Sequence, residues 1–159
     1  MMKVYTIGVY NTTEDAFFNK LLENKIDTFC DIRQRRGVRG REYSFVNSNY
    51  LQAKLKALNI SYMHCLELAP TSEIREKQKL HDIQHGVQKR SRDVLGDVFT
   101  REYNNKISTF NFDDFYDKLN NLGALHVVLF CVEEKASACH RSIVALKLKE
   151  KFECEVIHL

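Results

Sequence analysis

Short runs of apolar residues recur along the chain, and stretches with helical periodicity separate them. The strand-like runs are Val4–Val9, Ile26–Ile32, Ile60–His64, Leu125–Cys131 and Glu155–Leu159. Short, nearly continuous apolar runs are typical of strands buried on both faces. Strands that alternate with helices form a mostly parallel sheet through right-handed crossovers. The sequence therefore predicts an α/β fold: a single three-layer, Rossmann-like domain over residues 1–159, with about five strands and helices on both faces of the sheet.

Residues that favour the ends of helices mark the helical stretches. Candidate first residues or caps are Thr12 with Asp15, Ser48, Asn111 with Asp114, and Ser137. The pattern between Thr71 and Asn105 is weaker, and Gly86 and Gly96 predict two helices there rather than one. Gly123 is placed to end the helix that starts near Asn111.

The composition is that of an ordinary globular protein, with 44% apolar and 28% charged residues and a single proline. The longest apolar run, Val127–Val132, is too short to cross a membrane, and Met1–Tyr10 does not resemble a secretory signal. Five cysteines without paired short spacings favour free thiols in a reducing compartment. These features predict a cytoplasmic protein that does not associate with membranes. They do not indicate an oligomeric state.

The formal net charge is only +3, but the charges are unevenly distributed. Asp31–Phe45 holds five arginines against two acids, and Glu73–Lys106 holds eight bases against six acids. Such a local excess of basic residues can attract an anion, although an ordinary solvated surface with mixed charges gives similar numbers of basic and acidic residues.

Ligands of open parallel sheets usually bind beyond the carboxyl ends of the strands. That rule selects the residues that follow the first, second and fourth predicted strands, together with the start of the last helix. They are Tyr10, Asn11, Asp31, Arg33, Cys131, Glu133, Cys139, His140, Arg141 and Ser142.

Three segments at these positions occur in a characteristic order: Tyr5-Thr-Ile-Gly8, Asp31-Ile-Arg33, and Leu129-Phe-Cys-Val-Glu133 followed by Cys139-His-Arg-Ser142. Together they resemble, over nearly the whole chain, the family catalogued as domain of unknown function 488. Arg35-Arg-Gly-Val-Arg-Gly40, with Leu68-Ala-Pro-Thr71, resembles one subgroup of it. The resemblance implies the architecture and leaves the reaction open. Many relatives have Gly-His-Ser where this chain reads Gly8-Val9-Tyr10-Asn11, so no role of that histidine transfers here.

Arg33 and Arg141 are the candidate ligands for an anion. A helix start offers unpaired amide donors, and a guanidinium adds paired donors for phosphate or carboxylate. Asp31 and Arg33 are expected on the same face of their strand. The alternative is that Arg141 pairs with Glu133 or Asp31 and only holds the loop.

The loop after the second strand carries four further arginines, Arg35, Arg36, Arg39 and Arg41. A basic loop with Tyr43 and Phe45 close behind can follow a nucleic-acid backbone and stack on bases. The alternative is that these arginines hold the loop onto an acidic surface.

The candidate catalytic residues are Cys131, Glu133, Cys139 and His140. A thiol near a helix start and an arginine can act as a nucleophile, and a carboxylate can serve as acid or base. However, a phosphatase loop needs an arginine six positions after its cysteine, and residue 137 is Ser137. Buried, inert cysteines are the alternative.

No metal site and no cofactor are predicted. Cys131, Cys139 and His140, with His64, are possible metal ligands, but the paired short spacings of structural zinc sites are absent. The sequence also lacks a glycine-rich dinucleotide fingerprint and a phosphate loop.

The interpretation that we favour is a domain that binds or processes a phosphate-bearing small molecule or nucleic acid at the strand ends. A cysteine-dependent transferase or hydrolase and a noncatalytic nucleic-acid or protein interaction module remain alternatives. Whether the protein is an enzyme is left open.

Overall fold

The protein forms one five-stranded parallel sheet covered by helices, as the alternating sequence pattern predicts. The computed structural model describes all residues, Met1–Leu159. The strands are β1 (Lys3–Ile7), β2 (Thr28–Asp31), β3 (Ser61–His64), β4 (His126–Phe130) and β5 (Glu155–His158). Their order is β3-β2-β4-β1-β5, and every neighbouring pair is parallel. The predicted α/β class and the number of strands are therefore confirmed.

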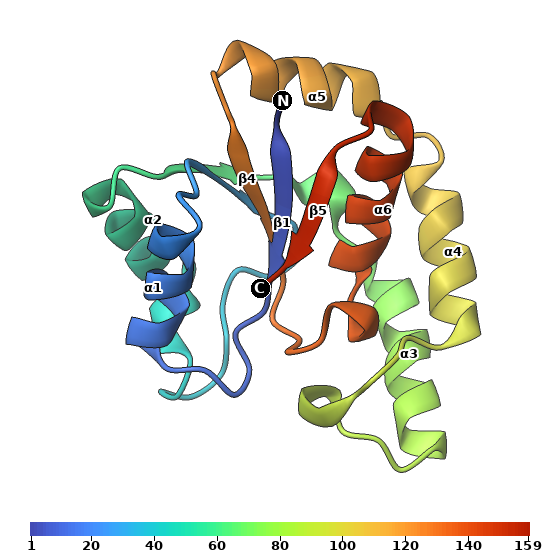
Figure 1. Cartoon of the computed structure of the whole chain (residues 1–159). Helices are drawn as coiled ribbons and strands as arrows, with labels where there is room; N and C mark the ends of the chain where they lie inside the picture. The colour runs from blue at the N-terminus through green and yellow to red at the C-terminus, as the bar shows by residue number, and fades with distance from the viewer.

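Helices lie on both faces of the sheet (Figure 1). They are α1 (Glu14–Glu23), α2 (Ser48–Ala57), α3 (Ser72–Gln84), α4 (Asp97–Ile107), α5 (Phe112–Asn121) and α6 (His140–Phe152). Helices α1 and α2 cover one face, and α4 and α6 cover the other (Figure 1). Helix α3 packs against α4 and extends beyond the carboxyl edge of the sheet, whereas α5 lies at the opposite, amino edge.

The two faces of the sheet carry separate hydrophobic cores, and the strands contribute to them by strict alternation. Val127 and Leu129 of β4 face the core that α3 to α6 cover, whereas Val128 and Phe130 face the core under α1 and α2. All four side chains are fully buried. A strand with both faces covered must be apolar throughout, which explains why the run ending at Cys131 is the most apolar in the chain.

The predicted helix ends are confirmed at several positions. The Asn111 side chain accepts a hydrogen bond from the amide of Asp114 and caps α5. Gly123 follows that helix with a φ of 73°. Gly86, with a φ of 64°, follows α3, and Gly96 precedes α4, so two helices form as expected.

Other caps differ from the prediction by one or two residues. Thr13 rather than Thr12 caps α1, and Asn47 rather than Ser48 precedes α2. Ser137 lies in a short 3₁₀ turn, and Cys139 takes the capping position of α6. The Ser137 hydroxyl donates to the carbonyl oxygen of Asp93, a tertiary contact that helix-start statistics do not contain.

The strand order brings three loops together at the carboxyl edge. Strand β4 lies between β1 and β2, so the chain segments that follow these three strands are neighbours.

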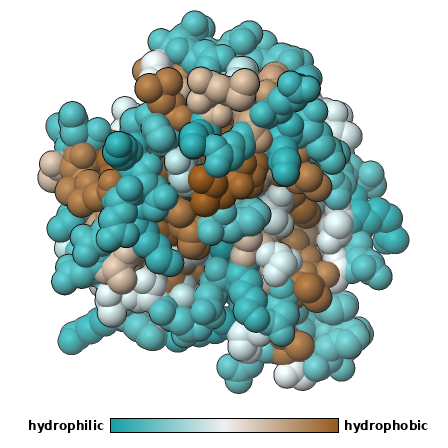
Figure 2. Space-filling view, in the orientation of Figure 1, coloured by the Kyte–Doolittle hydropathy of each residue, from teal (hydrophilic) through white to brown (hydrophobic).

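Edge strand β5 has no helix in front of it in Figure 1. Figure 2 shows apolar residues reaching the surface over β5 and β1, between the two helical layers. No helix combines the length and the apolar character needed to cross a membrane.

Candidate functional site: a basic cavity at the carboxyl edge

A cavity of about 670 Å³ lies beyond the carboxyl ends of the strands. Three segments that are far apart in the sequence form most of its wall, and Tyr10 from the loop after β1 adds to it. The three segments are the loop after β2 (residues 33–43), α3 with the segment that follows it (residues 70–99), and the loop between β4 and α6 (residues 131–140). This is where the switch-point rule for parallel sheets places a ligand site.

The lining of the cavity is strongly basic. Eight Lys or Arg side chains face three carboxylates across it. The basic residues are Arg33, Arg35, Arg39, Arg75, Lys79, Lys89, Arg90 and Arg92, and the acidic ones are Glu76, Asp82 and Glu133. Positive charges on a concave wall concentrate the field, because the low-dielectric protein around them screens little.

The structure brings most of the candidate residues from the sequence to this one cavity. Those in its wall are Tyr10, Arg33, Arg35, Arg39, Cys131, Glu133, Cys139 and His140. Asn11, Asp31, Arg36, Arg41, Arg141 and Ser142 lie outside the wall. The arginine-rich loop is therefore divided, with two of its four arginines on the cavity and two facing elsewhere.

Arg33 is held at the end of β2 by a buried ion pair. Its guanidinium donates to both carboxylate oxygens of Asp31, at 2.9 and 2.8 Å, and to the carbonyl oxygen of Val46. Its Cζ lies 4.6 Å from the centroid of the Phe130 ring. The remaining nitrogen, Nη1, is buried and has no hydrogen-bond partner. Arg33 thus lines the cavity with a side chain that is fixed by its contacts and that has one buried donor without a partner.

Arg141 has a different environment from Arg33. Only 1% of the residue is exposed, and its guanidinium donates to the carbonyl oxygens of Glu133 and Glu134, at 2.5 and 2.9 Å. It therefore braces the loop after β4. The acceptors are backbone carbonyls rather than the carboxylates considered from the sequence.

Asn11 and Ser142 also make internal contacts. The Asn11 side chain donates to the carboxylate of Glu134, and its backbone amide donates to the hydroxyl of Tyr43. The Ser142 hydroxyl donates to the carbonyl oxygen of Cys139. Both residues thus help to shape loops that border the cavity.

A buried clasp connects α3 to the loop after β4. Arg92 donates to the carboxylate of Asp82 at 2.7 Å, to that of Glu133 at 3.1 Å, and to the carbonyl oxygen of Ala138 at 2.9 Å. Arg92, Asp82 and Glu133 are all buried. Because Asp82 belongs to α3 and Glu133 follows β4, this arginine fixes one cavity wall against the other.

Glu133 is ionised despite its burial. Burial alone would raise the pKa of its carboxyl group. The charge of Lys89, the hydrogen bond from Cys131 and the neighbouring His140 and Arg92 together lower the pKa to about 2. Lys89 Nζ lies 3.7 Å from Oε1 of Glu133. The carboxylate thus neutralises part of the basic wall at neutral pH, so its charge is already compensated when an anion approaches.

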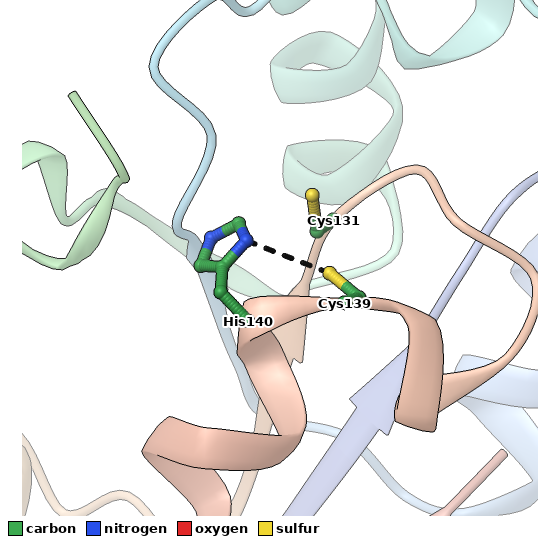
Figure 3. Close-up of side chains that lie close together, drawn as sticks. All are labelled: Cys131, Cys139 and His140. Carbon is green, nitrogen blue, oxygen red and sulfur yellow. Dashed lines mark hydrogen bonds between the residues drawn. The ribbon is translucent and has the colours of Figure 1, made fainter. Parts of the chain in front are cut away.

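Two thiols and an imidazole meet at the floor of the cavity. Cys131 comes directly after β4, and Cys139 and His140 stand at the start of α6. Figure 3 shows both sulfur atoms and the imidazole ring facing one shared space. Sγ of Cys139 lies 3.6 Å from Nδ1 of His140, and the ligand atoms of all three residues lie within 4.8 Å of one another.

The tautomer of His140 follows from its other contact. Nε2 lies 2.9 Å from the carbonyl oxygen of Ile32 and must donate to it, since a carbonyl has no proton to give. In the neutral ring Nδ1 then carries a lone pair that points toward the thiols.

The Cys131 thiol is protonated at neutral pH. A hydrogen bond with Cys139, together with burial, raises its pKa well above the usual value. Its Sγ donates to Oε2 of Glu133 at 3.0 Å. The nucleophile of thiol chemistry is the thiolate, so this environment does not favour Cys131 as a nucleophile by itself.

Two tyrosines and an arginine line the outer part of the cavity. The rings of Tyr10 and Tyr43 lie 5.3 Å apart, and Cζ of Arg90 is 5.5 and 5.4 Å from their respective centroids. Tyr43 is buried, so a planar ligand can stack here on the half-buried ring of Tyr10 and on the exposed guanidinium of Arg90.

The sequence-based choice of residues missed the wall that α3 and the following segment supply: Arg75, Lys79, Asp82, Lys89, Arg90 and Arg92. The excess of bases in Glu73–Lys106 was the only signal for it. That excess did not distinguish residues on the cavity from residues in solvent.

Comparison with known proteins adds a family match that covers most of the chain. The model of the family described as "Domain of unknown function DUF488" matches residues 13–148. Neither a curated protein nor a solved structure matches the sequence.

Proposed function

Because this chain belongs to the family described as "Domain of unknown function DUF488", whose description names no activity, we propose a function from the site itself: the cavity binds a phosphate-bearing ligand of nucleotide size. The observation that carries this proposal is the excess of eight basic over three acidic side chains in its wall. A volume of about 670 Å³ falls within the range of small-molecule sites.

Uncommitted donors support the proposal. Arg35 and Arg39 are exposed and form no ion pair, and Nη1 of Arg33 has no partner. Most other bases of the wall have a carboxylate neighbour, as Arg92 has Asp82. An incoming phosphate would therefore meet free guanidinium donors at the loop after β2. A guanidinium can donate two parallel hydrogen bonds to one phosphate, and such bidentate contacts are strong.

The aromatic wall supports a nucleotide rather than a simple phosphate. The half-buried ring of Tyr10 offers a face for a base, and the buried ring of Tyr43 and the guanidinium of Arg90 pack beside it. The division of the arginine-rich loop also fits a cavity ligand, because only Arg35 and Arg39 face it. We propose that the chain belongs to the subgroup that the Arg35–Gly40 segment resembles, and that these two arginines are what this segment contributes to binding.

The test compares two double variants with equal charge changes. Arg35→Gln/Arg39→Gln removes the free arginines of the cavity, and Arg41→Gln/Arg101→Gln removes two exposed arginines outside it. Nucleoside triphosphates, inorganic tripolyphosphate and a fluorescent single-stranded RNA serve as probes in melting-temperature and anisotropy measurements. The cavity variant is expected to bind at least about tenfold more weakly, and its salt slope should fall by roughly one for each arginine that no longer reaches a phosphate. The control variant is expected to bind like the wild type.

Three results would overturn the proposal. One is a wild-type protein that neither nucleotides nor tripolyphosphate stabilise. Another is equal weakening by both double variants, which would identify a general basic surface instead of a cavity. Tight binding of RNA without binding of nucleotides would likewise assign the arginines to an extended strand.

A further inference from the structure

The three residues at the floor of the cavity have the composition of a metal site. Thiolates and imidazole are the ligands that Zn²⁺ prefers, and two cysteines with one histidine form a known three-ligand set. We propose that Cys131, Cys139 and His140 bind one Zn²⁺ ion. The metal site does not rest on the proposed function, because none of the three residues is among the basic groups that would hold the phosphate-bearing ligand.

The spacing of the ligand atoms fits tetrahedral coordination. Bonds of about 2.3 Å to sulfur and about 2.05 Å to nitrogen place the two atoms about 3.6 Å apart at the tetrahedral angle. Sγ of Cys139 lies 3.6 Å from Nδ1 of His140. All three ligand atoms lie within 4.8 Å of one another, so modest side-chain rotations bring Cys131 to the same centre.

The contact behind the imidazole supports this assignment. Metal-binding histidines commonly donate their second ring N–H to a carbonyl or carboxylate, which fixes the ring and directs the lone pair at the metal. His140 does this through Nε2 and the carbonyl oxygen of Ile32, at 2.9 Å. Only 4% of His140 is exposed, so the ring is held by its surroundings before any ion arrives.

The charges at the site also balance when the ion binds. Each thiol gives up its proton to solvent, and the two thiolates that form neutralise Zn²⁺. The hydrogen bond from Cys131 to Glu133 then breaks, but the carboxylate keeps its contacts with Arg92 and Lys89.

The fourth position of the ion is open. Three protein ligands leave one tetrahedral corner unfilled, and all three residues line the cavity. A water molecule or an oxygen of the cavity ligand can take that corner. Open three-ligand sites are typical of catalytic zinc, whereas structural zinc is closed by four protein ligands.

The test measures metal content and coordination directly. The full chain, prepared with zinc and without chelators, is expected to hold about one Zn²⁺ per molecule by mass spectrometry. The Co²⁺ form is expected to show the thiolate-to-cobalt absorption bands of tetrahedral coordination. Cys139→Ser and His140→Gln remove ligands outright, so they are expected to weaken metal binding by more than the about 10- to 100-fold that follows when only a residue behind a ligand is replaced.

The control is Cys65→Ser, because Cys65 and Cys30 form the other pair of neighbouring thiols. This variant is expected to retain the ion and the cobalt spectrum. A wild-type protein without stoichiometric zinc and without thiolate bands would falsify the site, even if the variants fail to fold. A loss of zinc in Cys65→Ser as large as that in Cys139→Ser would also overturn the proposal.

The Arg35→Gln/Arg39→Gln variant separates the metal site from the phosphate proposal. It is expected to keep its zinc while losing nucleotide affinity. Retention of zinc without nucleotide binding in the wild type would reject the proposed function and leave the metal site standing.

Discussion

Nη1 of Arg92 donates a hydrogen bond of 2.7 Å to Oδ2 of Asp82, and both side chains are buried. Neither residue belongs to a strand, yet the pair joins α3 to the loop that carries Glu133. The basic wall on α3 is therefore held in place by an ion pair rather than by apolar packing alone.

Replacing Asp82 by asparagine is expected to destabilise the protein by about 3 kcal/mol. The change removes a buried charge without changing the size of the side chain. Arg92 keeps its ion pair with Glu133 in this variant. The expected loss of stability therefore lies at the low end of the range for broken buried ion pairs. Urea denaturation measures the free energy of unfolding. Asp93→Asn, which breaks the exposed pair with Lys135, is the matched control and should cost less than about 1 kcal/mol. Similar losses in both variants would contradict the buried clasp.

Replacing Gly8 by alanine is expected to destabilise the protein by about 1–3 kcal/mol. A Cβ atom at this position would collide with the carbonyl group of Glu133 and would lie 3.2 Å from Nη2 of Arg141. The backbone carbonyl has little freedom to move because Arg141 holds it. Gly37→Ala is the control, since its nearest neighbour would be 3.8 Å away. That variant should stay within about 0.5 kcal/mol of the wild type in the same denaturation experiment. A Gly8→Ala variant as stable as the wild type would show that the loops after β1 and β4 are not tightly packed against each other.

Stability is expected to fall between pH 10 and pH 12 because of Tyr62. Burial raises its pKa to about 12, and the charge of Asp31 adds to this effect against the opposing influence of Arg36. The hydroxyl donates to Oδ2 of Asp31 at 2.8 Å. The unfolded chain releases the proton near pH 10 and the folded protein holds it longer, so the stabilisation present below pH 10 is lost as the pH rises.

Subtracting the unfolding free energy of the Tyr62→Phe variant from that of the wild type separates the effect of Tyr62 from that of the other tyrosines. The difference in unfolding free energy between wild type and variant should shrink from pH 10 to pH 12. A difference that stays constant over that interval would show that Tyr62 titrates normally.

Replacing Tyr10 by leucine is expected to weaken nucleotide binding by about 1 kcal/mol or more, while tripolyphosphate binding stays unchanged. The ring of Tyr10 offers a stacking surface for a base, but a bare phosphate chain cannot use it. Isothermal titration with both probes provides the measurement. Equal weakening for both probes would place Tyr10 at the phosphates instead of the base.

The strands, and the loops that follow them at the site, were largely predictable from local sequence, whereas their order in the sheet was not predicted. An apolar run such as Val127–Val132 has one favourable structure when both faces are covered, and Asp31 and Arg33, two residues apart, meet as expected. The ends of β1, β2 and β4 follow from the rule that parallel strands share a carboxyl edge.

The α3 wall was not predictable in the same way. Asp82 and Arg92 are typical surface residues by composition, and their burial depends on how α3 docks against the loop after β4. The distinction between Arg33 and Arg141 also depends on tertiary structure. Both are buried arginines at an element end, and only the backbone path decides that one reaches the cavity and the other reaches two carbonyl groups.

The strand order has a consequence for how the chain acquires its structure during synthesis. Strand β1 leaves the ribosome before the other four strands, but its partners are β4 and β5, which are more than one hundred residues further along the chain. Strand β1 must therefore remain unpaired until β4 has been made. Such long-range pairing slows folding, and apolar segments that wait for a partner are prone to aggregate or to need a chaperone. Strand β1, the earliest of the five strands, thus joins the sheet only after the central strand β4 has been made.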